Sequence, residues 1–243
     1  MTVSIAIVCE ARADRNTACT LADRILIAHD SIHWIDEESI DHHREWRGLL
    51  KSDSMLKWTE VNRLAQENRV KPVNGHFKGL PGHPYAHQAR RALLLLAKSS
   101  QRPQAVLFQI DADDQPKRRL GLEQAREGFD RIFPIIIGVA ITERECWHLA
   151  GFDPRDDVET RILDEIRSEI GFHPCLRSQE LTAKRDHHLK SAKRILGLVT
   201  QDNAEREASC LTHAFEILEE RGKENGLADF LNEIRERLVP LFR

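Results

Sequence analysis

The sequence lacks several features that would assign it to a broad class at once. Its formal net charge is only -3, so any nucleic-acid contact must come from local basic patches. It has neither a run of about 20 apolar residues, as bilayer spanning needs, nor a signal-like segment at its start. Its five cysteines are odd in number and scattered, which favours reduced thiols. We therefore expect a soluble cytoplasmic protein with no membrane contact.

Strand-like and helix-like segments alternate over residues 1–150. Three runs rich in β-branched residues predict strands buried on both faces: 3–9, 105–110 and 134–141. Apolar residues at helical spacing predict helices over three further segments: 16–28, 85–97 and 120–129. This alternation is typical of an α/β fold with a mostly parallel sheet flanked by helices.

Two other stretches do not follow this alternation. Residues 29–84 mix tryptophans, charges and a Gly/Pro/His-rich run, which indicates short helices and a loop with one strand near 70–73. After Trp147 the apolar residues recur only at helical spacing, including one predicted helix through Ala208 and Leu218. We therefore predict an α/β domain over 1–150 with an irregular insertion at about 29–84, followed by a helical C-terminal region over 151–243.

Acidic residues stand where two of the predicted strands end. Asp111 and Asp113 come directly after the 105–110 strand, and residues two apart in extended chain point to the same side. Glu10 follows the first strand, and functional groups in such sheets gather at the carboxyl ends of the strands. Carboxylate oxygens suit Mg2+ or Mn2+. The sequence therefore predicts a magnesium or manganese site built from these three side chains.

The layout of these acids resembles the Toprim fold of topoisomerases, primases and overcoming-lysogenisation-defect nucleases. An apolar strand precedes Glu10-x-x-x-Asp14 and a helix, and a later strand precedes Asp111-x-Asp113. More closely, it resembles the stand-alone bacterial Toprim-like proteins encoded beside ABC-type ATPases in anti-phage defence. In those proteins, too, an acidic stretch followed by a tryptophan, here Trp147, often comes after the third strand.

The resemblance implies a Mg2+-dependent nuclease, the effector subunit of a bacterial defence system that works with an ABC-type ATPase. It implies that Glu10 is a general base or metal ligand and that Asp111 and Asp113 are metal ligands. Glu143 or Glu145 would complete a second metal site. DNA and RNA both remain open as substrates, and assembly into an oligomer is allowed.

Two basic groups are candidates for binding nucleic acid. The first comes just after the Asp-x-Asp sequence and consists of Lys117, Arg118 and Arg119. The second lies on one predicted helix face and consists of Lys190, Lys193 and Arg194. Clustered cations of this kind contact phosphates, although a solvated helix face has the same composition.

Three other functions share parts of this pattern. A haloacid dehalogenase-type phosphatase would use Asp111 as nucleophile and Asp113 as acid/base, but Gln115 stands where that family has Thr or Val. A nucleotide-sugar glycosyltransferase would hold Mn2+ on the same pair and leave Glu10 without a role. A non-catalytic Toprim-like scaffold would dock on an ATPase through the helical C-terminal region.

Overall fold

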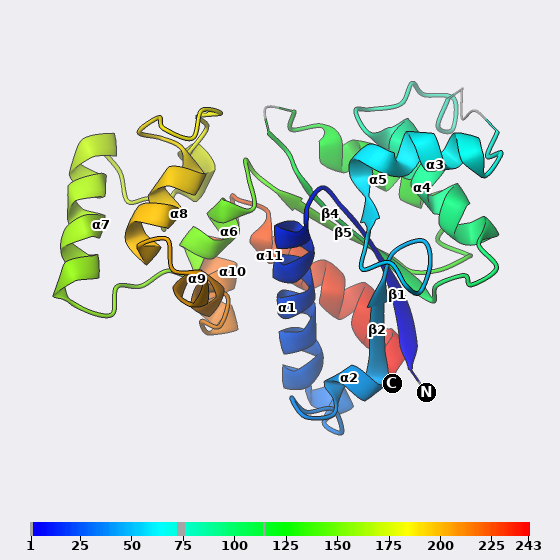
Figure 1. Cartoon of the computed structure of the whole chain (residues 1–243), viewed down its shortest axis with the longest axis horizontal. Coiled ribbons are helices and arrows are strands. Elements are labelled where there is room, and N and C mark those ends of the chain that lie inside the picture. Colours follow the sequence, from blue (N-terminus) through cyan, green and yellow to red (C-terminus); the bar gives the residue numbers. More distant parts are fainter. Residues whose placement is uncertain (1, 72–75, 114) are drawn as a thin grey trace. The chain divides into compact units, whose positions relative to one another are not determined.

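A computed structural model describes residues 2–71, 76–113 and 115–243 of the chain (Figure 1). The fold is α/β, with a mostly parallel five-stranded sheet flanked by helices and a helical C-terminal region. Contacts divide the chain into two compact units. The sheet unit comprises Met1–Ile110, Gln115–Val139 and Phe230–Arg243, and the helical unit comprises Asp111–Asp114 and Ala140–Asp229. The sequence predicts one boundary near residue 150, whereas the contacts begin the main part of the helical unit at Ala140 and assign the last segment, Phe230–Arg243, to the sheet unit.

The sheet has the strand order β2-β1-β4-β5, and the short β3 also pairs with β1. Its strands are β1 (Val3–Cys9), β2 (Arg44–Arg47), β3 (Leu56–Lys57), β4 (Ala105–Asp111) and β5 (Ile135–Ala140). β1 is parallel to β2, β3 and β4, and Cys9 is in register with Gln109. The parallel sheet and three of its strands were expected from the apolar runs. Because these strands are parallel, their carboxyl ends lie at one edge of the sheet.

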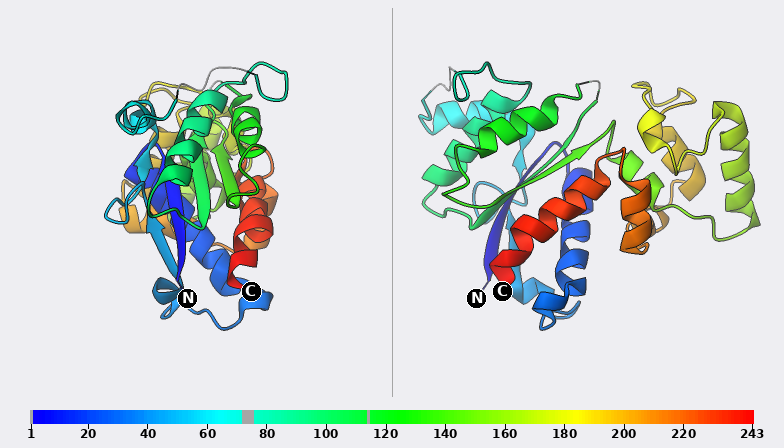
Figure 2. Two further views of the ribbon diagram at one scale, coloured as in Figure 1. Left: turned by 90° about the vertical axis from the view of Figure 1, so that its right-hand side faces the viewer. Right: turned by 180° about the vertical axis from the view of Figure 1, so that it is seen from behind.

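Helices cover both faces of this sheet (Figures 1 and 2). On one side lie α1 (Arg12–Ala28) and the C-terminal segment, which runs from α11 (Leu227–Glu233) through a π-helical turn (Ile234–Leu238) to Phe242. On the other side lie α3 (Val61–Glu67), α4 (Ala86–Lys98) and α5 (Arg118–Arg126). Among the described residues, no helix is long and apolar enough to span a membrane.

The segment 29–84 contributes two strands that its sequence pattern does not reveal. β2 has the sequence Arg-Glu-Trp-Arg and lies at the sheet edge next to β1. An edge strand has solvent on one side and can carry charged residues, so it gives no apolar signal. A short helix, α2 (Ile40–His43), precedes it. The strand predicted near 70–73 falls partly on residues 72 and 73, which lie outside the described residues, and residues 70 and 71 are in no strand.

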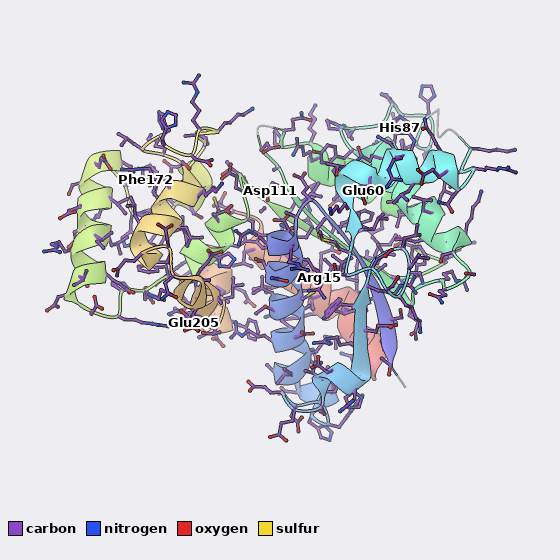
Figure 3. The ribbon with its side chains drawn as sticks, viewed as in Figure 1. Arg15, Glu60, His87, Asp111, Phe172 and Glu205 are labelled. Atoms are coloured by element: carbon purple, nitrogen blue, oxygen red, sulfur yellow. The ribbon has the colours of Figure 1, made fainter. Side chains whose placement is uncertain are left out.

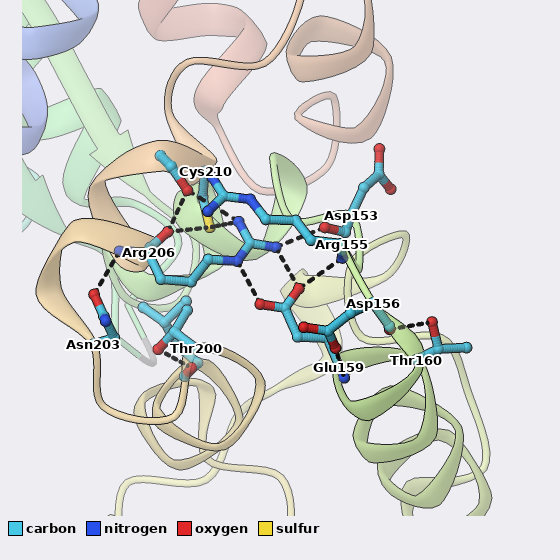
Figure 4. Close-up of polar contacts among 11 residues, drawn as sticks. Asp153, Arg155, Asp156, Glu159, Thr160, Thr200, Asn203, Arg206 and Cys210 are labelled. Carbon is cyan, nitrogen blue, oxygen red and sulfur yellow. Dashed lines mark hydrogen bonds and ion pairs between the residues drawn. The ribbon is translucent and has the colours of Figure 1, made fainter.

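The helical unit contains α6 (Glu145–Ala150), α7 (Asp157–Ile170), α8 (Ala192–Thr200), α9 (Ala204–Cys210) and α10 (Phe215–Arg221). The single helix predicted through Ala208 and Leu218 is wrong, because the chain turns between α9 and α10. The Thr212 hydroxyl donates to the carbonyl of Ser209 at 2.8 Å, a local bond that competes with helix continuation. A buried ion pair between Glu159 of α7 and Arg206 of α9 joins two of the helices (Figure 4).

Candidate metal centre

The end of β1 places Glu10 at the surface of the sheet unit. Glu10 directly follows the strand and is exposed, and α1 begins two residues later. The amide of Ala11 donates to Asp14 Oδ2 at 2.7 Å, so the Asp14 carboxylate caps the start of this helix. Ala11 has φ -138° and ψ 169°, an extended conformation that any residue adopts without strain. The turn after β1 is therefore unstrained with alanine at this position.

A buried glutamine lies beside the end of β1. Gln109 of β4 is fully buried and pairs in register with Cys9, the residue before Glu10. Among the described residues, neither its amide oxygen nor its amide nitrogen has a hydrogen-bond partner. A buried amide without partners costs about 1–3 kcal/mol, which a polar ligand or an ordered water would recover. The carboxyl edge of the sheet is thus suited to hold a polar group.

Asp111 and Asp113 belong to the helical unit, whereas Glu10, the third acid of the predicted cluster, belongs to the sheet unit. Asp111 is the last residue of β4 and is half-buried (Figure 3). Asp113 is exposed and adopts a left-handed conformation with φ 46°, which aspartate tolerates better than most residues. Its amide donates to the carbonyl of Thr142 at 3.0 Å, which ties the end of β4 to the chain after β5.

Glu143 lies close to Asp113. Both residues line one cavity of about 110 Å³, together with Thr142, Lys184 and the chain around Leu181. The pKa of Glu143 is raised above its usual range, first by burial and then by the negative charges of neighbouring acids, Asp113 among them. The structure thus brings together two acids that are thirty positions apart in the sequence and that the sequence assigned to different parts of the metal site.

Buried hydrogen bonds hold the wall of this cavity. The Thr142 hydroxyl donates to the carbonyl of Leu181 at 2.8 Å, and Thr142 is only 8% exposed. The Asn225 amide donates to the carbonyl of Cys146 at 3.0 Å and to Ser178 Oγ at 2.9 Å. These bonds fix the backbone on both sides of Glu143. The cavity is therefore preformed by the fold.

The negative charge of Glu145 also raises the pKa of Glu143, but the Glu145 carboxylate is itself paired with an arginine. Arg144 Nη2 donates to Glu145 Oε1 at 2.8 Å, and Arg144 Nη1 donates to Glu207 Oε1 at 2.8 Å. Of the two acids predicted for a second metal site, Glu143 therefore lines the cavity, whereas Glu145 is engaged in an ion pair.

Arg144 also affects the tautomer and the protonation state of His148. The Nδ1 of His148 lies 3.1 Å from the carbonyl of Glu207, which can only accept, so Nδ1 carries the proton and Nε2 accepts from Arg144 Nη1 at 3.0 Å. Burial and the Arg144 charge lower the pKa of His148 to about 4. His148 is therefore neutral near pH 7.

We expect the free energy of unfolding to fall as the pH drops from about 6.5 to about 4. The unfolded chain takes up a proton at His148 in this window and the folded chain does not, so stability decreases by up to about 1.4 kcal/mol per pH unit. Above pH 6.5 this group contributes no pH dependence. Denaturant unfolding from pH 4 to 8 measures it, with His148→Gln as the comparison. Superimposable pH profiles for the two proteins would contradict the assignment, as would a histidine NMR spectrum showing His148 protonated at pH 6.

The predicted basic residues after the Asp-x-Asp sequence have different surroundings. Lys117 is exposed. Arg118 is 6% exposed, and its guanidinium lies 4.2 Å from the centre of the Tyr85 ring. Arg119 Nε donates to Glu123 Oε1 at 3.0 Å. Only Lys117 of these three therefore presents its charge directly to solvent.

The second predicted basic group lies in the helical unit. Lys190 Nζ is 5.5 Å from the centre of the Phe172 ring, and Arg194 Nη2 is 3.4 Å from Glu169 Oε2. Lys193 Nζ donates to Asp186 at 2.9 Å, and its pKa is raised by Asp186 and then by Glu145 and Glu143. Lys193 therefore lies in the electric field of the acids around the cavity, which places one predicted phosphate-binding lysine near the predicted metal ligands.

Among the described residues, no group of three or more His, Cys, Asp or Glu side chains is arranged to hold a metal ion. Mg2+ needs fewer protein ligands than this, because it is usually held by one or two carboxylates together with waters and substrate phosphates. Asp113 and Glu143, close enough to perturb a pKa and lining one cavity, fit that requirement. They are the residues that would hold the ion.

Gln109, in the sheet unit, was not among the residues predicted from the sequence. Gln109 had a visible signal, because it is the one polar residue inside the strand Ala-Val-Leu-Phe-Gln-Ile. Lys184 lines the cavity although it lies more than forty positions from Glu143, and nothing in the local sequence indicates that placement. All five cysteines are buried and none forms a disulfide.

The chain matches no family model, no curated protein and no solved structure.

Proposed function

We propose that this chain is a Mg2+- or Mn2+-dependent phosphodiesterase, a Toprim-like nuclease that acts as the effector subunit beside an ABC-type ATPase. The observation that carries the proposal is the shared cavity of Asp113 and Glu143, in which burial and then the neighbouring carboxylates raise the pKa of Glu143. Such a cluster is unfavourable in the protein alone and becomes favourable when a divalent cation shares it. Asp111, at the end of β4, and Glu10, at the end of β1 in the sheet unit, are the other acids predicted from the sequence to bind metal.

Each residue of the centre has a proposed task. A bound ion would supply a Lewis acid that stabilises charge on a scissile phosphate and lowers the pKa of a bound water. Asp113 and Glu143 would hold the ion through their carboxylate oxygens. Lys184, which lines the cavity, and Lys193, which lies in the field of Glu143, attract the phosphate. Glu10 would act as ligand or general base, and Lys117 would contact the nucleic-acid backbone.

Metal binding tests the centre. Titration calorimetry with Mn2+ should show affinity reduced at least tenfold in Asp113→Asn and in Glu143→Gln, because each variant loses a carboxylate ligand. The matched control is Glu165→Gln, which removes one exposed carboxylate from α7 and should leave affinity unchanged. Affinity should also rise with pH as Glu143 loses its proton. Equal affinity in all four proteins would refute the site.

Cleavage tests the function. Single-stranded and double-stranded DNA and RNA are incubated with Mn2+ or Mg2+, with and without the ATPase partner. We expect cleavage that is lost in Asp111→Ala, Asp113→Asn and Glu10→Gln and kept in Glu165→Gln. Removing a like charge from the cluster should leave thermal stability unchanged or higher, which separates loss of chemistry from loss of folding. Cleavage that persists in the three acid variants would overturn the assignment.

A non-catalytic scaffold subunit of an ATPase complex is the second candidate. It is favoured by the engagement of Glu145 with Arg144, which occupies one of the acids predicted for a second metal site. It would bind the ATPase with the same affinity in wild type and in Asp113→Asn, and it would cleave no substrate. Co-purification with the ATPase combined with the cleavage assay distinguishes the two.

A further inference from the structure

A second polar site lies at the amino-terminal ends of the strands of the sheet unit. A cavity of about 700 Å³ opens there, within the range of about 300–1,000 Å³ typical of small-molecule sites. Its lining includes Thr2 and Ser4 at the start of β1, Arg44 at the start of β2, and Gln104 just before β4. β1 has seven residues, so this cavity and Glu10 are roughly 20 Å apart along the strand.

The charge of this cavity is positive. Its ionisable lining groups are four cations and two anions, which sum to +2: Arg44, Arg47, Lys51, Arg102, Asp41 and Glu45. One of the four cations, Arg44, is already neutralised by ion pairs with Asp23 at 2.8 Å and with Asp41 at 2.6 Å. The other three cations leave an excess of positive charge over the two lining acids.

Arg47 is an unusual member of this set. It is 1% exposed, and its guanidinium donates to the carbonyls of Gly48, Leu49 and Gln101. Among the described residues, no carboxylate lies within ion-pair distance of it. A guanidinium has five N–H donors, and these three bonds leave two unused. Arg47 is thus a buried cation that lines the cavity and feels the charges of Glu45 and Asp53 without a direct ion pair to either, and an anion in the cavity would provide one.

The other lining side chains of the cavity also suit an anionic ligand. Lys51 Nζ is 3.6 Å from Glu45 and is well exposed, which makes a weak pair. Arg102 is exposed and, within the described part of the chain, forms no ion pair. The hydroxyl of Ser4 is buried and has no hydrogen-bond partner among the described residues, so it can donate to a ligand oxygen. No described lining residue is aromatic, so a nucleobase has no stacking surface here.

We propose that this cavity, lined by Ser4, Arg47, Lys51 and Arg102, binds the phosphate group of a phosphorylated ligand. Phosphate fits because it is anionic and offers several acceptor oxygens to guanidinium, ammonium and hydroxyl donors. The phosphate comes either from a mononucleotide-sized molecule or from the backbone of a nucleic-acid strand. The site lies at the opposite end of the strands from Glu10 and does not depend on the proposed metal centre.

Binding without metal tests the proposal. Full-length protein in EDTA is titrated with adenosine 5′-monophosphate and with a short single-stranded DNA, by calorimetry and by fluorescence anisotropy. We expect at least one probe to bind, with affinity that falls as salt rises. Binding of the mononucleotide supports a small phosphorylated ligand, and binding of the DNA alone supports a strand backbone. Because EDTA removes divalent ions, the result of this experiment is independent of whether Asp113 and Glu143 bind a metal.

Matched variants identify the site. Arg102→Gln and Lys51→Gln should each weaken binding about tenfold, as expected for loss of one charge-assisted hydrogen bond. Arg131→Gln removes an exposed arginine of the same unit outside the cavity and should change affinity less than twofold. All three residues are exposed or weakly paired, so folding is preserved. Absence of binding by both probes at millimolar concentration, or equal weakening by Arg131→Gln, would overturn the proposal.

Discussion

Replacing Glu159 with alanine will lower the free energy of unfolding of the helical unit by about 3–5 kcal/mol, because it leaves the buried cation of Arg206 without a counter-charge. Arg206 Nε donates to Glu159 Oε1 at 2.8 Å and Arg206 Nη2 donates to Glu159 Oε2 at 2.9 Å (Figure 4). Both side chains are under 10% exposed. Chemical denaturation monitored by circular dichroism measures the loss.

The surroundings of this pair explain the size of the effect. Arg206 Nη2 also donates to the carbonyl of Asp153 at 2.6 Å, and the guanidinium lies 4.4 Å from the centre of the Phe152 ring. The Glu159 carboxylate accepts the amide of Arg155 at 2.8 Å. The pair therefore joins α7, α9 and the chain between α6 and α7, and removing one partner leaves several polar groups buried and unsatisfied.

The double variant Glu159→Met/Arg206→Met is the control for this prediction. It removes both charges and fills the space with apolar side chains, so it should be much closer to wild type than Glu159→Ala. Arg206 lowers the pKa of Glu159, so the pair stabilises the fold fully above the ordinary value near 4.5 and the stabilisation is lost as pH falls through the lowered pKa. A single variant as stable as the double variant would contradict the buried-pair account.

Replacing Gly121 with alanine will destabilise the sheet unit by about 3 kcal/mol, at the upper end of the usual cost of overpacking. A methyl group at Gly121 would lie 1.8 Å from the carbonyl oxygen of Pro84 and 2.9 Å from the amide nitrogen of Ala86. These are backbone atoms at the start of α4, which cannot rotate away as a side chain can. The close packing of α5 against the start of α4 therefore depends on the missing side chain. Thermal and denaturant unfolding measure the change.

Gly128 provides the matched control for Gly121. It follows α5 by two positions, and the nearest heavy atom to a methyl group there is the Ala125 carbonyl oxygen at 3.8 Å. Gly128→Ala should therefore be neutral or stabilise by up to about 1 kcal/mol, because it restricts the unfolded chain. Similar stability of the two alanine variants would show that α4 moves to accommodate the new methyl group.

Local sequence predicted the buried parts of the sheet well and its edge poorly. The apolar runs that became β1, β4 and β5 are visible because a strand covered on both faces needs apolar side chains at every position. β2 remained hidden because its residues, Arg44 to Arg47, lie at the edge and carry charge. Its strand conformation comes from hydrogen bonds to β1, which are a property of the folded chain.

For the candidate metal-binding acids, too, the sequence predicted some features and the structure was needed for others. Position after a strand identified Glu10, Asp111 and Asp113 as candidates, and the resemblance to Toprim-like proteins implied Glu143 or Glu145 as a further ligand. Only the structure shows how Glu143 and Glu145 differ, because it places Glu143 in a cavity with Asp113 and pairs Glu145 with Arg144. It also showed that Arg118 is buried against Tyr85, which no charge pattern could reveal.

The sequence by itself determined the α/β class, the parallel core strands and the acids at their ends, because periodicity and strand boundaries depend on neighbouring residues. The tertiary structure alone decided which acid shares a cavity with Asp113, which cations remain exposed, and that a positive cavity forms around Arg47. Those properties depend on burial and on distances between residues that are far apart in the chain. Electrostatic energy follows such distances, and local sequence does not contain them.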